Sequence, residues 1–263
     1  MNRGTTPPGV SGEEQAASWV RGMFNRVAPR YDLLNHLLSF QMDRWWRAQT
    51  VNRLHPPLRR PNVRVLDICC GTGDLTIALA NKHRGEVFGS DFSFPMLSEA
   101  ARKVKRTGTR AALFEADALS LPLRDASLDV IAVAFGFRNL ANYQRGLAEM
   151  RRVLKPGGVA AILEFSTPPN AVFRAFYNLY SRKILPAVGG LISGSRDAYR
   201  YLPESVRKFP GAETLARQME EAGFDSVQFL RLTGGIVALH TGVRSATSDH
   251  SGGQLTQPVE SLG

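Results

Sequence analysis

The chain has 263 residues, a hydrophobic fraction of 43% and a formal net charge of +10 at pH 7. This length suits one large α/β domain or two small ones, and no apolar run reaches the about 18 residues of a membrane span. The basic excess is compatible with nucleic acid, an anionic membrane surface or solubility alone. The only cysteines, Cys69 and Cys70, are adjacent, which argues against a disulfide or a zinc site. We expect a cytoplasmic protein without bound metal.

Both ends of the chain are predicted to lie outside the folded part. Residues 1–12 are rich in Pro, Gly and Thr and lack an apolar signal-peptide core, so they predict a disordered lead-in. Residues 245–263 are polar and rich in Gly and Ser, which predicts a disordered tail. A single domain is therefore expected over residues 13–244.

The domain begins with helices. Residues 13–60 carry dense apolar and aromatic side chains, and the pattern breaks at Leu54-His-Pro-Pro-Leu-Arg-Arg-Pro61. Strands and helices then alternate over a core of residues 63–166. The predicted strands are 63–68, 87–91, 112–115, 128–135 and 159–165, and the predicted helices between them are 75–83, 95–106 and 143–154. Alternation with short connections predicts a parallel, doubly wound sheet.

The alternation ends after residue 166. A helical insertion over residues 170–207 is followed by a helix at 212–222 and two strands, 227–232 and 236–243. These strands are separated by Thr233-Gly-Gly235 and should pair antiparallel. A mostly parallel, Rossmann-like sheet of seven strands that ends in such a hairpin is the α/β fold of class I methyltransferases.

The most informative segment is Val63-Arg-Val-Leu-Asp-Ile-Cys-Cys-Gly-Thr-Gly-Asp74. It predicts a strand that ends on Asp67, a glycine-containing turn and a helix, and the next strand ends on Asp91. Two strand-terminal carboxylates, the second about 20 residues beyond the turn, suit a nucleoside whose ribose diol binds the second acid. No phosphate-binding motif is present. The pattern favours S-adenosylmethionine, and the alternative is the plain strand–helix turn of another doubly wound protein.

Three strand ends divide the expected cofactor contacts. Asp67 and the glycine turn would hold the methionine part and the ribose, Asp91 both ribose hydroxyls, and Asp117 the adenine amino group. Any one of these acids could instead cap a helix or close a turn, but three at successive strand ends favour a binding site. The predicted cofactor-binding residues are Asp67, Gly71, Thr72, Gly73, Asp91, Asp117, Ala118 and Ala134.

Several motifs together indicate a family. They are Tyr31-Asp-Leu-Leu-Asn-His-Leu-Leu-Ser39 with Trp46, Cys70-Gly-Thr-Gly-Asp74, Phe135-Gly-Phe-Arg-Asn139, Arg152-Val-Leu-Lys-Pro-Gly-Gly158 with Glu164-Phe-Ser166, Tyr199-Arg-Tyr-Leu-Pro-Glu-Ser205, and Gly235-Ile-Val-Ala-Leu-His240. Over residues 19–244 the chain resembles the MenG/UbiE family of quinone-ring C-methyltransferases. It departs from the family pattern at Asp43, where the family usually has His, at Cys69, where many methyltransferases have Gly, and at the small Ala160.

The resemblance implies methylation of a demethylmenaquinol ring, which needs a deprotonated ring hydroxyl and a carbon in line with the sulfonium methyl. Arg138 would stabilise the quinolate and Asn139 would orient the ring oxygen. His240 and Tyr201 are the candidate proton acceptors. The alternatives are a structural ion pair for Arg138 and a backbone-bonded core histidine for His240.

The helical insertion is expected to contact the prenyl tail of the quinol. One face has helical spacing and basic residues beside it, which suits a lid at the inner face of an anionic membrane. The same face could simply pack on the N-terminal helices. The residues of this face are Phe173, Phe176, Tyr177, Tyr180 and Ile184.

Other functions remain open at this stage. The same fold could methylate a ubiquinone-pathway benzoquinol or another phenolic ring. A non-catalytic RNA-associated protein is a different class, suggested by the basic charge alone. The densest basic run, residues 102–106, is interpreted as a solvated helix end, and no nucleic-acid motif accompanies it, so no nucleic acid partner is expected. The sequence does not determine the oligomeric state, and a homodimer is one option.

Overall fold

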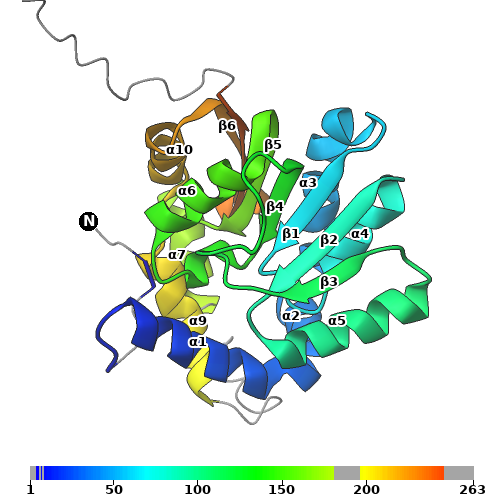
Figure 1. Cartoon of the computed structure of the whole chain (residues 1–263). Coiled ribbons are helices and arrows are strands. Elements are labelled where there is room, and N and C mark those ends of the chain that lie inside the picture. The colour runs from blue at the N-terminus through cyan, green and yellow to red at the C-terminus, as the bar shows by residue number, and fades with distance from the viewer. Residues whose placement is uncertain (1–3, 6, 8, 181–195, 246–263) are drawn as a thin grey trace, which may run out of the picture.

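The computed structural model describes residues 4, 5, 7, 9–180 and 196–245. The predicted tail therefore lies outside the described residues except for Ser245, and so does Ile184 of the predicted lid face. The described chain forms a sheet with helices on both faces (Figure 1). No helix among these residues is long and apolar enough to cross a membrane.

The sheet has seven strands in the order β3-β2-β1-β4-β5-β7-β6. The first five pair in parallel, and β7 pairs antiparallel with both β5 and β6. This arrangement confirms the predicted class I methyltransferase fold. The strands are β1 (Arg64–Ile68), β2 (Glu86–Asp91), β3 (Ala112–Glu115), β4 (Leu128–Ala134), β5 (Leu154–Phe165), β6 (Phe224–Leu232) and β7 (Val237–Arg244).

Alternate residues of the central strands enter two hydrophobic cores. Leu66 and Ile68 of β1 face one core with α6 (Tyr143–Val153) and α10 (Ala212–Glu221). Val65 faces the other core with α3 (Met42–Leu58) and α4 (Asp74–Lys82). A strand buried on both faces reads as a continuous apolar run, as 63–68 does.

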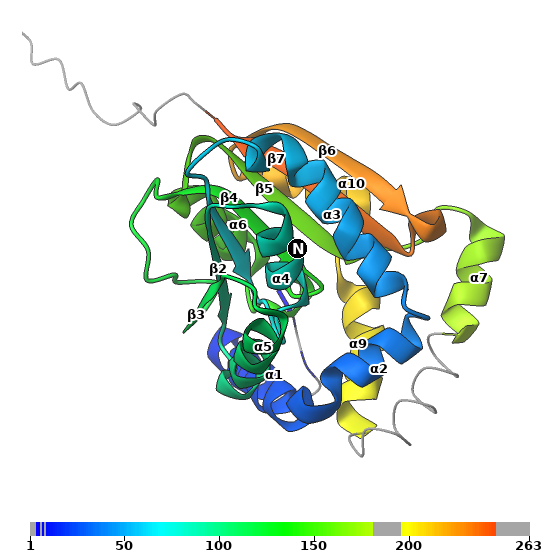
Figure 2. The ribbon, with the colours of Figure 1, turned by 90° about the vertical axis from the view of Figure 1, so that its right-hand side faces the viewer.

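Helix α5 (Phe94–Thr107) connects β2 to β3 and packs against both strands. The remaining helices gather beyond the carboxyl ends of the parallel strands. They are α1 (Glu13–Val27), α2 (Tyr31–Leu38), α7 (Ala171–Leu179) and α9 (Arg196–Lys208), with short 3-10 turns η1 (Ala28–Arg30), η2 (Phe137–Asn139) and η4 (Thr233–Gly235). Figure 2 shows α1, α2 and α9 at this end of the sheet, and α7 standing away from it.

Three boundaries differ from the prediction by more than one residue. Helix α3 continues to Leu58 through Pro56 and Pro57, because both prolines lie in its last turn and Leu58 is buried one turn beyond Leu54. Strand β5 begins five residues before the predicted start: Leu154 pairs with Leu128, and a register shift precedes the pairing at Val130. The start of β6 is likewise three residues earlier, across an irregularity between Asp225 and Gln228.

The prediction of a disordered lead-in is wrong for Gly4 and Thr5, which are buried. The Thr5 amide donates to the Leu140 carbonyl over 2.8 Å. Gly4 lies so close to the next turn that a Cβ atom on it would be 1.9 Å from the Ala141 carbonyl oxygen. Composition missed this segment because backbone contacts and the hydrogen bond of the Thr5 hydroxyl to Tyr201, and no apolar stripe, hold it in place.

Candidate active site

A hollow with a buried acid, here named the Asp91 pocket, lies where β1, β2 and β4 end. The Asp91 carboxylate is buried and accepts hydrogen bonds from the Gly71 amide and the Ser93 amide, both over 2.9 Å. Burial raises the pKa of Asp91 to about 6, and these amide bonds oppose the rise. The carboxylate is thus fixed in direction and charged at neutral pH.

The wall of the Asp91 pocket is mixed in character. Asp117 and Ala118, after β3, line it as predicted, and so does Gly71. The Asp117 Oδ1 accepts from the Leu119 amide over 2.9 Å, which turns the chain around the rim. Apolar surface comes from several elements, namely from Ala17, Phe24, Phe92, Met96, Leu119 and Leu140. An acid beside an apolar slot suits a ribose with its base.

Four residues predicted to bind the cofactor do not line this pocket. Asp67 is fully buried and its Oδ2 accepts from the Thr76 hydroxyl over 2.6 Å. The Thr72 hydroxyl donates to Asp32, Gly73 caps α4, and Ala134 packs in the core with α3. In this structure these residues contact neighbouring helices and loops and do not face the hollow.

The turn at the pocket floor depends on close approach of two loops. Cys69 and Phe135 both adopt left-handed backbone conformations, with φ of 51° and 61°. A Cβ atom on Gly136 would lie 2.4 Å from the Cys69 Cβ, so only glycine fits there. Cys69 therefore occupies a conformation that glycine usually adopts, and this explains how the β1 and β4 loops can meet.

A second hollow, the Arg138 cavity, opens beside the first and has a volume of about 350 Å³. Its lining is mostly aromatic, with a few polar groups, as in sites for apolar ligands. The lining residues are Tyr31, Asn35, Ser39, Phe40, Met42, Asp43, Trp46, Arg47, Phe135, Arg138, Phe165, Phe173, Phe176, Tyr177, Tyr180, Leu202, Thr233 and Ile236.

Two guanidinium groups reach this cavity. Arg138 is buried and pairs with Glu164 over 2.9 Å, and its guanidinium carbon lies 5.2 Å from the centre of the Phe165 ring. Arg47 pairs with Asp43 over 2.5 Å and lies 5.5 Å from the centre of the Phe135 ring. Arg138 therefore has the predicted place and also makes an ion pair, so the two interpretations of it are compatible.

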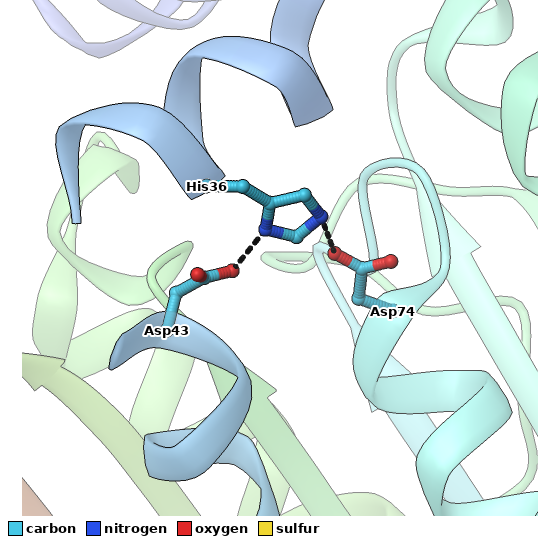
Figure 3. A group of neighbouring side chains, drawn as sticks. All are labelled: His36, Asp43 and Asp74. Atoms are coloured by element: carbon cyan, nitrogen blue, oxygen red, sulfur yellow. Dashed lines mark hydrogen bonds and ion pairs between the residues drawn. The ribbon is translucent and has the colours of Figure 1, made fainter. Parts of the chain in front are cut away.

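Behind the cavity wall, His36 bridges two carboxylates (Figure 3). Its Nδ1 lies 2.8 Å from Asp43 Oδ2 and its Nε2 lies 3.9 Å from Asp74 Oδ2. Asp43, which lines the Arg138 cavity, holds the ring on one side. Asp74, the first residue of α4, holds it on the other. These contacts give Asp43 a fixed orientation.

The three ligand-type side chains His36, Asp43 and Asp74 are close enough to hold a metal ion. Two cations already neutralise the carboxylates, because Arg47 pairs with Asp43 and Lys103 pairs with Asp74. Lys103 also pairs with Asp32 over 2.7 Å. The basic helix end was predicted to be solvated, and for Lys103 this is wrong: its side chain turns inward to join the network.

The Asp91 pocket and the Arg138 cavity share two walls. Tyr31 and Phe135 line both hollows. Tyr31 begins α2, and Phe135 follows β4 in its strained loop. Groups bound in the two hollows would thus meet edge to edge across these rings, which is the arrangement that a group transfer between two ligands requires.

Asn139 and Tyr201 are joined directly. The Tyr201 hydroxyl donates to Asn139 Oδ1 over 3.1 Å, and Asn139 lines the Asp91 pocket. Tyr201 itself lines neither hollow, and burial raises its pKa, so the phenol keeps its proton. It is therefore not placed to take a proton directly from a ring in the Arg138 cavity, its role as a proton relay stays a prediction, and its contact makes it a support for Asn139.

His240 is also misplaced by the prediction. It lies on β7, is buried, and its Nε2 is 2.8 Å from the Ala212 carbonyl oxygen of α10. It lines neither hollow, so it cannot reach a ring hydroxyl there. The alternative interpretation, a core histidine bonded to backbone, is correct, and the role of proton acceptor is wrong.

The sequence reasoning missed the N-terminal contribution to both hollows. Tyr31, Asp43 and Arg47 come from α2 and α3, and Phe24 from α1. Their signal was available: Tyr31 and the polar residues that follow it interrupt an otherwise apolar helical stretch. Polar groups on a helix that should be buried are the usual sign of a site.

Comparison with known proteins agrees with this geometry. Residues 10–244 match the model of the ubiE/COQ5 methyltransferase family. A Thermus thermophilus protein named demethylmenaquinone methyltransferase is 48% identical over 84% of this chain and 100% of its own length. A Syntrophotalea carbinolica protein named ubiquinone/menaquinone biosynthesis C-methyltransferase UbiE is 46% identical over 87% of this chain and 95% of its own.

Solved structures support the fold alone. A Thermotoga maritima SAM-dependent methyltransferase, described as a possible histamine N-methyltransferase, has a TM-score of 0.60 at 20% identity, with coverage of 86% and 100%. A Haemonchus contortus phosphoethanolamine N-methyltransferase in complex with S-adenosyl-L-methionine has a TM-score of 0.55 at 14% identity, with coverage of 75% and 52%.

Proposed function

Because this chain belongs to the ubiE/COQ5 methyltransferase family, we propose that it transfers a methyl group from S-adenosylmethionine to the naphthoquinol ring of demethylmenaquinol, giving menaquinol. The chain is a methyltransferase that uses S-adenosylmethionine in quinone biosynthesis. One observation supports this acceptor. The acid-bearing Asp91 pocket adjoins the aromatic-rich Arg138 cavity, and Tyr31 and Phe135 line both.

In this proposal the nucleoside occupies the Asp91 pocket. Asp91 accepts hydrogen bonds from both ribose hydroxyls, and Asp117 with the Ala118 amide faces the adenine edge. Phe92 and Met96 provide the apolar slot for the base. The Gly71-Thr72-Gly73 turn and Asp67 lie behind the methionine part, and Asp67 acts through the turn that Thr76 ties to it.

The quinol ring occupies the Arg138 cavity near the shared wall. Its nucleophilic carbon becomes strong when the neighbouring hydroxyl loses its proton, and a nearby fixed cation lowers the energy of that anion. Arg138, over the Phe165 ring, and Arg47, over the Phe135 ring, supply two such cations. Asn139, held by Tyr201, lines the Asp91 pocket and not the cavity proposed for the ring, and its amide donates to the Phe135 carbonyl at the shared wall over 3.4 Å.

The prenyl tail leaves by the mouth of the Arg138 cavity. Phe173, Phe176, Tyr177 and Tyr180 line it from the α7 side, and Phe40 closes it opposite, 6.0 Å from the Tyr180 ring. Helices α2 and α7, which supply lining residues, and the residue Phe40 also present exposed apolar side chains. Those more than 45% exposed are Leu33, Leu37, Phe40, Val172, Phe176 and Leu179.

We place this apolar rim against a membrane surface, where the tail of the substrate resides. Single exposed apolar residues are ordinary, but Phe40 and Phe176 of the cavity lining are both exposed, and four more apolar side chains are exposed on helices that also supply lining residues. With a net charge of +10, attraction to anionic lipid would bring the mouth to the bilayer. The same arrangement would serve a ubiquinone-pathway benzoquinol, whose ring is smaller.

Direct assay tests the acceptor. Purified protein with methyl-labelled S-adenosylmethionine and reduced demethylmenaquinol in anionic vesicles should give labelled menaquinol. A demethylated benzoquinol with the same tail, assayed in parallel, should react more slowly by tenfold or more. Equal rates would broaden the acceptor class, and no product from either quinol would refute the proposed function.

A further inference from the structure

The proposed reaction needs a group that takes the quinol proton. Neither residue predicted for that role lines the Arg138 cavity, where the quinol is proposed to bind. We propose that Asp43 takes the proton of the quinol hydroxyl, with His36 and Ser39 as positioning residues that fix its carboxylate. This inference rests on the proposed function, because it assigns a role within that reaction. It does not depend on which quinol is methylated.

Placement is the first argument. Among the described residues that line the Arg138 cavity, Asp43 has the one carboxylate, and none is a histidine. Its side chain is 5% exposed, so it is shielded from bulk water while facing the hollow. Glu164, the other nearby carboxylate, is engaged with Arg138 and lines neither hollow.

The hydrogen bonds leave one position free. Asp43 Oδ2 accepts from Arg47 over 2.5 Å and from His36 over 2.8 Å, while Oδ1 accepts from the Ser39 hydroxyl over 2.7 Å. A carboxylate offers about four acceptor positions, so the remaining one is on Oδ1. Ser39, which donates to Asp43 Oδ1, also lines the cavity, so Oδ1 lies on the side where the quinol is proposed to bind.

Arg47 gives the transfer its driving force. In the resting site its charge is balanced by Asp43. When Asp43 becomes neutral by protonation, that guanidinium loses its nearer counterion at the moment when the quinol becomes an anion, and the Asp74 carboxylate remains 3.9 Å away. Both groups line the same cavity, so the cation shifts its stabilisation from one anion to the other. A carboxylate of low basicity can act as the base because the charge it gives up is replaced by the quinolate.

The quinol O–H bond breaks and its proton moves to Asp43 Oδ1. The electron pair passes through the ring to the carbon that forms the new bond to the methyl group. The methyl–sulfur bond breaks and its pair stays on sulfur, leaving a neutral thioether. The ring carbon then loses its hydrogen as a proton while Asp43 returns its own proton to the ring carbonyl oxygen, so one proton is released overall.

The test replaces the carboxylate with a group of the same shape. Asp43→Asn should lower kcat for the labelled-methyl assay by about 100-fold or more. S-adenosylmethionine affinity, measured by calorimetry, should change less than threefold. Activity of Asp43→Asn should recover as pH rises, because the quinol then ionises without help. The matched control is Asp129→Asn: Asp129 also pairs with a basic side chain, that of Lys155, but lines neither hollow, and the kcat of this variant should stay at the wild-type value.

A second variant keeps the inference testable if Asp43→Asn does not fold. Asp43→His supplies a base whose pKa in a free peptide is about 6.5. Its kcat should stay within about tenfold of wild type, and its acid limb should move upward toward that pH. The three side chains that face Asp43, namely those of His36, Arg47 and Ser39, are left unchanged in this variant.

Two results would overturn the assignment: a wild-type kcat in Asp43→Asn, or an unchanged acid limb in Asp43→His. Wild-type protein that methylates no quinol would instead refute the proposed function, so the two failures are distinguishable.

Discussion

The Thr5 hydroxyl lies 2.6 Å from the Tyr201 hydroxyl, although 196 residues separate them in the chain. Tyr201 gives its single proton to Asn139, so Thr5 must be the donor in this contact. The result is a directed chain of hydrogen bonds from the N-terminal segment to a residue of the Asp91 pocket. A segment with little apolar surface thus contributes to the order of the site.

Removing that donor should cost stability. Thr5→Val keeps the shape but leaves the buried Tyr201 oxygen without its donor, which should lower the free energy of unfolding by about 1–2 kcal/mol. Urea denaturation measures this. Thr5→Ser keeps the hydroxyl and should recover most of the loss, whereas equal losses for both variants would mean that the methyl group, not the hydrogen bond, matters.

Asp91 should control cofactor binding. Asp91→Asn replaces two charge-assisted acceptor positions and should weaken S-adenosylmethionine binding at least tenfold by calorimetry. Because the pKa of Asp91 is raised to about 6, wild-type affinity should also fall as the pH drops below that value. The variant should lack this dependence, and a parallel fall in both proteins would assign the effect to another group.

Asp67 should make stability depend on pH. Burial raises its pKa to about 7 in the folded protein, while an unfolded chain releases this proton near about pH 3.9. Between these values the folded state holds more protons, so the free energy of unfolding must fall as pH rises through that window. Urea midpoints at several pH values should show a flatter profile in Asp67→Asn than in wild type.

Arg138 should act on the transition state. Arg138→Lys keeps the charge but loses the planar fork that pairs with Glu164 and faces the cavity, so kcat should fall at least tenfold with cofactor affinity nearly unchanged. Arg64→Lys, in an exposed pair with Glu86, is the control. If only the melting temperature of Arg138→Lys changes, the ion pair is structural.

The lid should distinguish tail lengths. Phe176→Ser with Tyr180→Ser removes two apolar contacts worth about 1.5–3 kcal/mol each when buried, so KM for a long-tailed quinol should rise tenfold or more. A short-tailed quinol should be affected much less. Leu230→Ser, at an exposed position on β6, serves as the control. Equal changes for both substrates would mean that the tail leaves elsewhere.

The sequence predicted the sheet and the acid-bearing strand ends because their signals are local. A strand that ends on Asp91, with a glycine turn 20 residues earlier, needs no knowledge of distant contacts. The polar groups of the acceptor cavity were harder. Arg47 and Asp43 belong to a helix that the fold carries over the carboxyl ends of the strands, and nothing near them in sequence states where that helix lies.

His240 shows the opposite error. Its position at the end of a familiar motif suggested chemistry, but strand alternation decides which face a side chain takes, and β7 directs it toward α10. Placing it required the register between β5 and β7, which composition does not reveal.

The two aromatic rings shared by both hollows have a thermodynamic consequence. Any ligand that orders Tyr31 or Phe135 in one hollow alters the wall of the other, so with the proposed occupants the affinities of nucleoside and quinol should be coupled. Such coupling is reciprocal: whatever factor S-adenosylmethionine contributes to quinol binding, the quinol contributes to its retention. The spent nucleoside is held by the same walls, and its departure is therefore tied to that of the methylated ring.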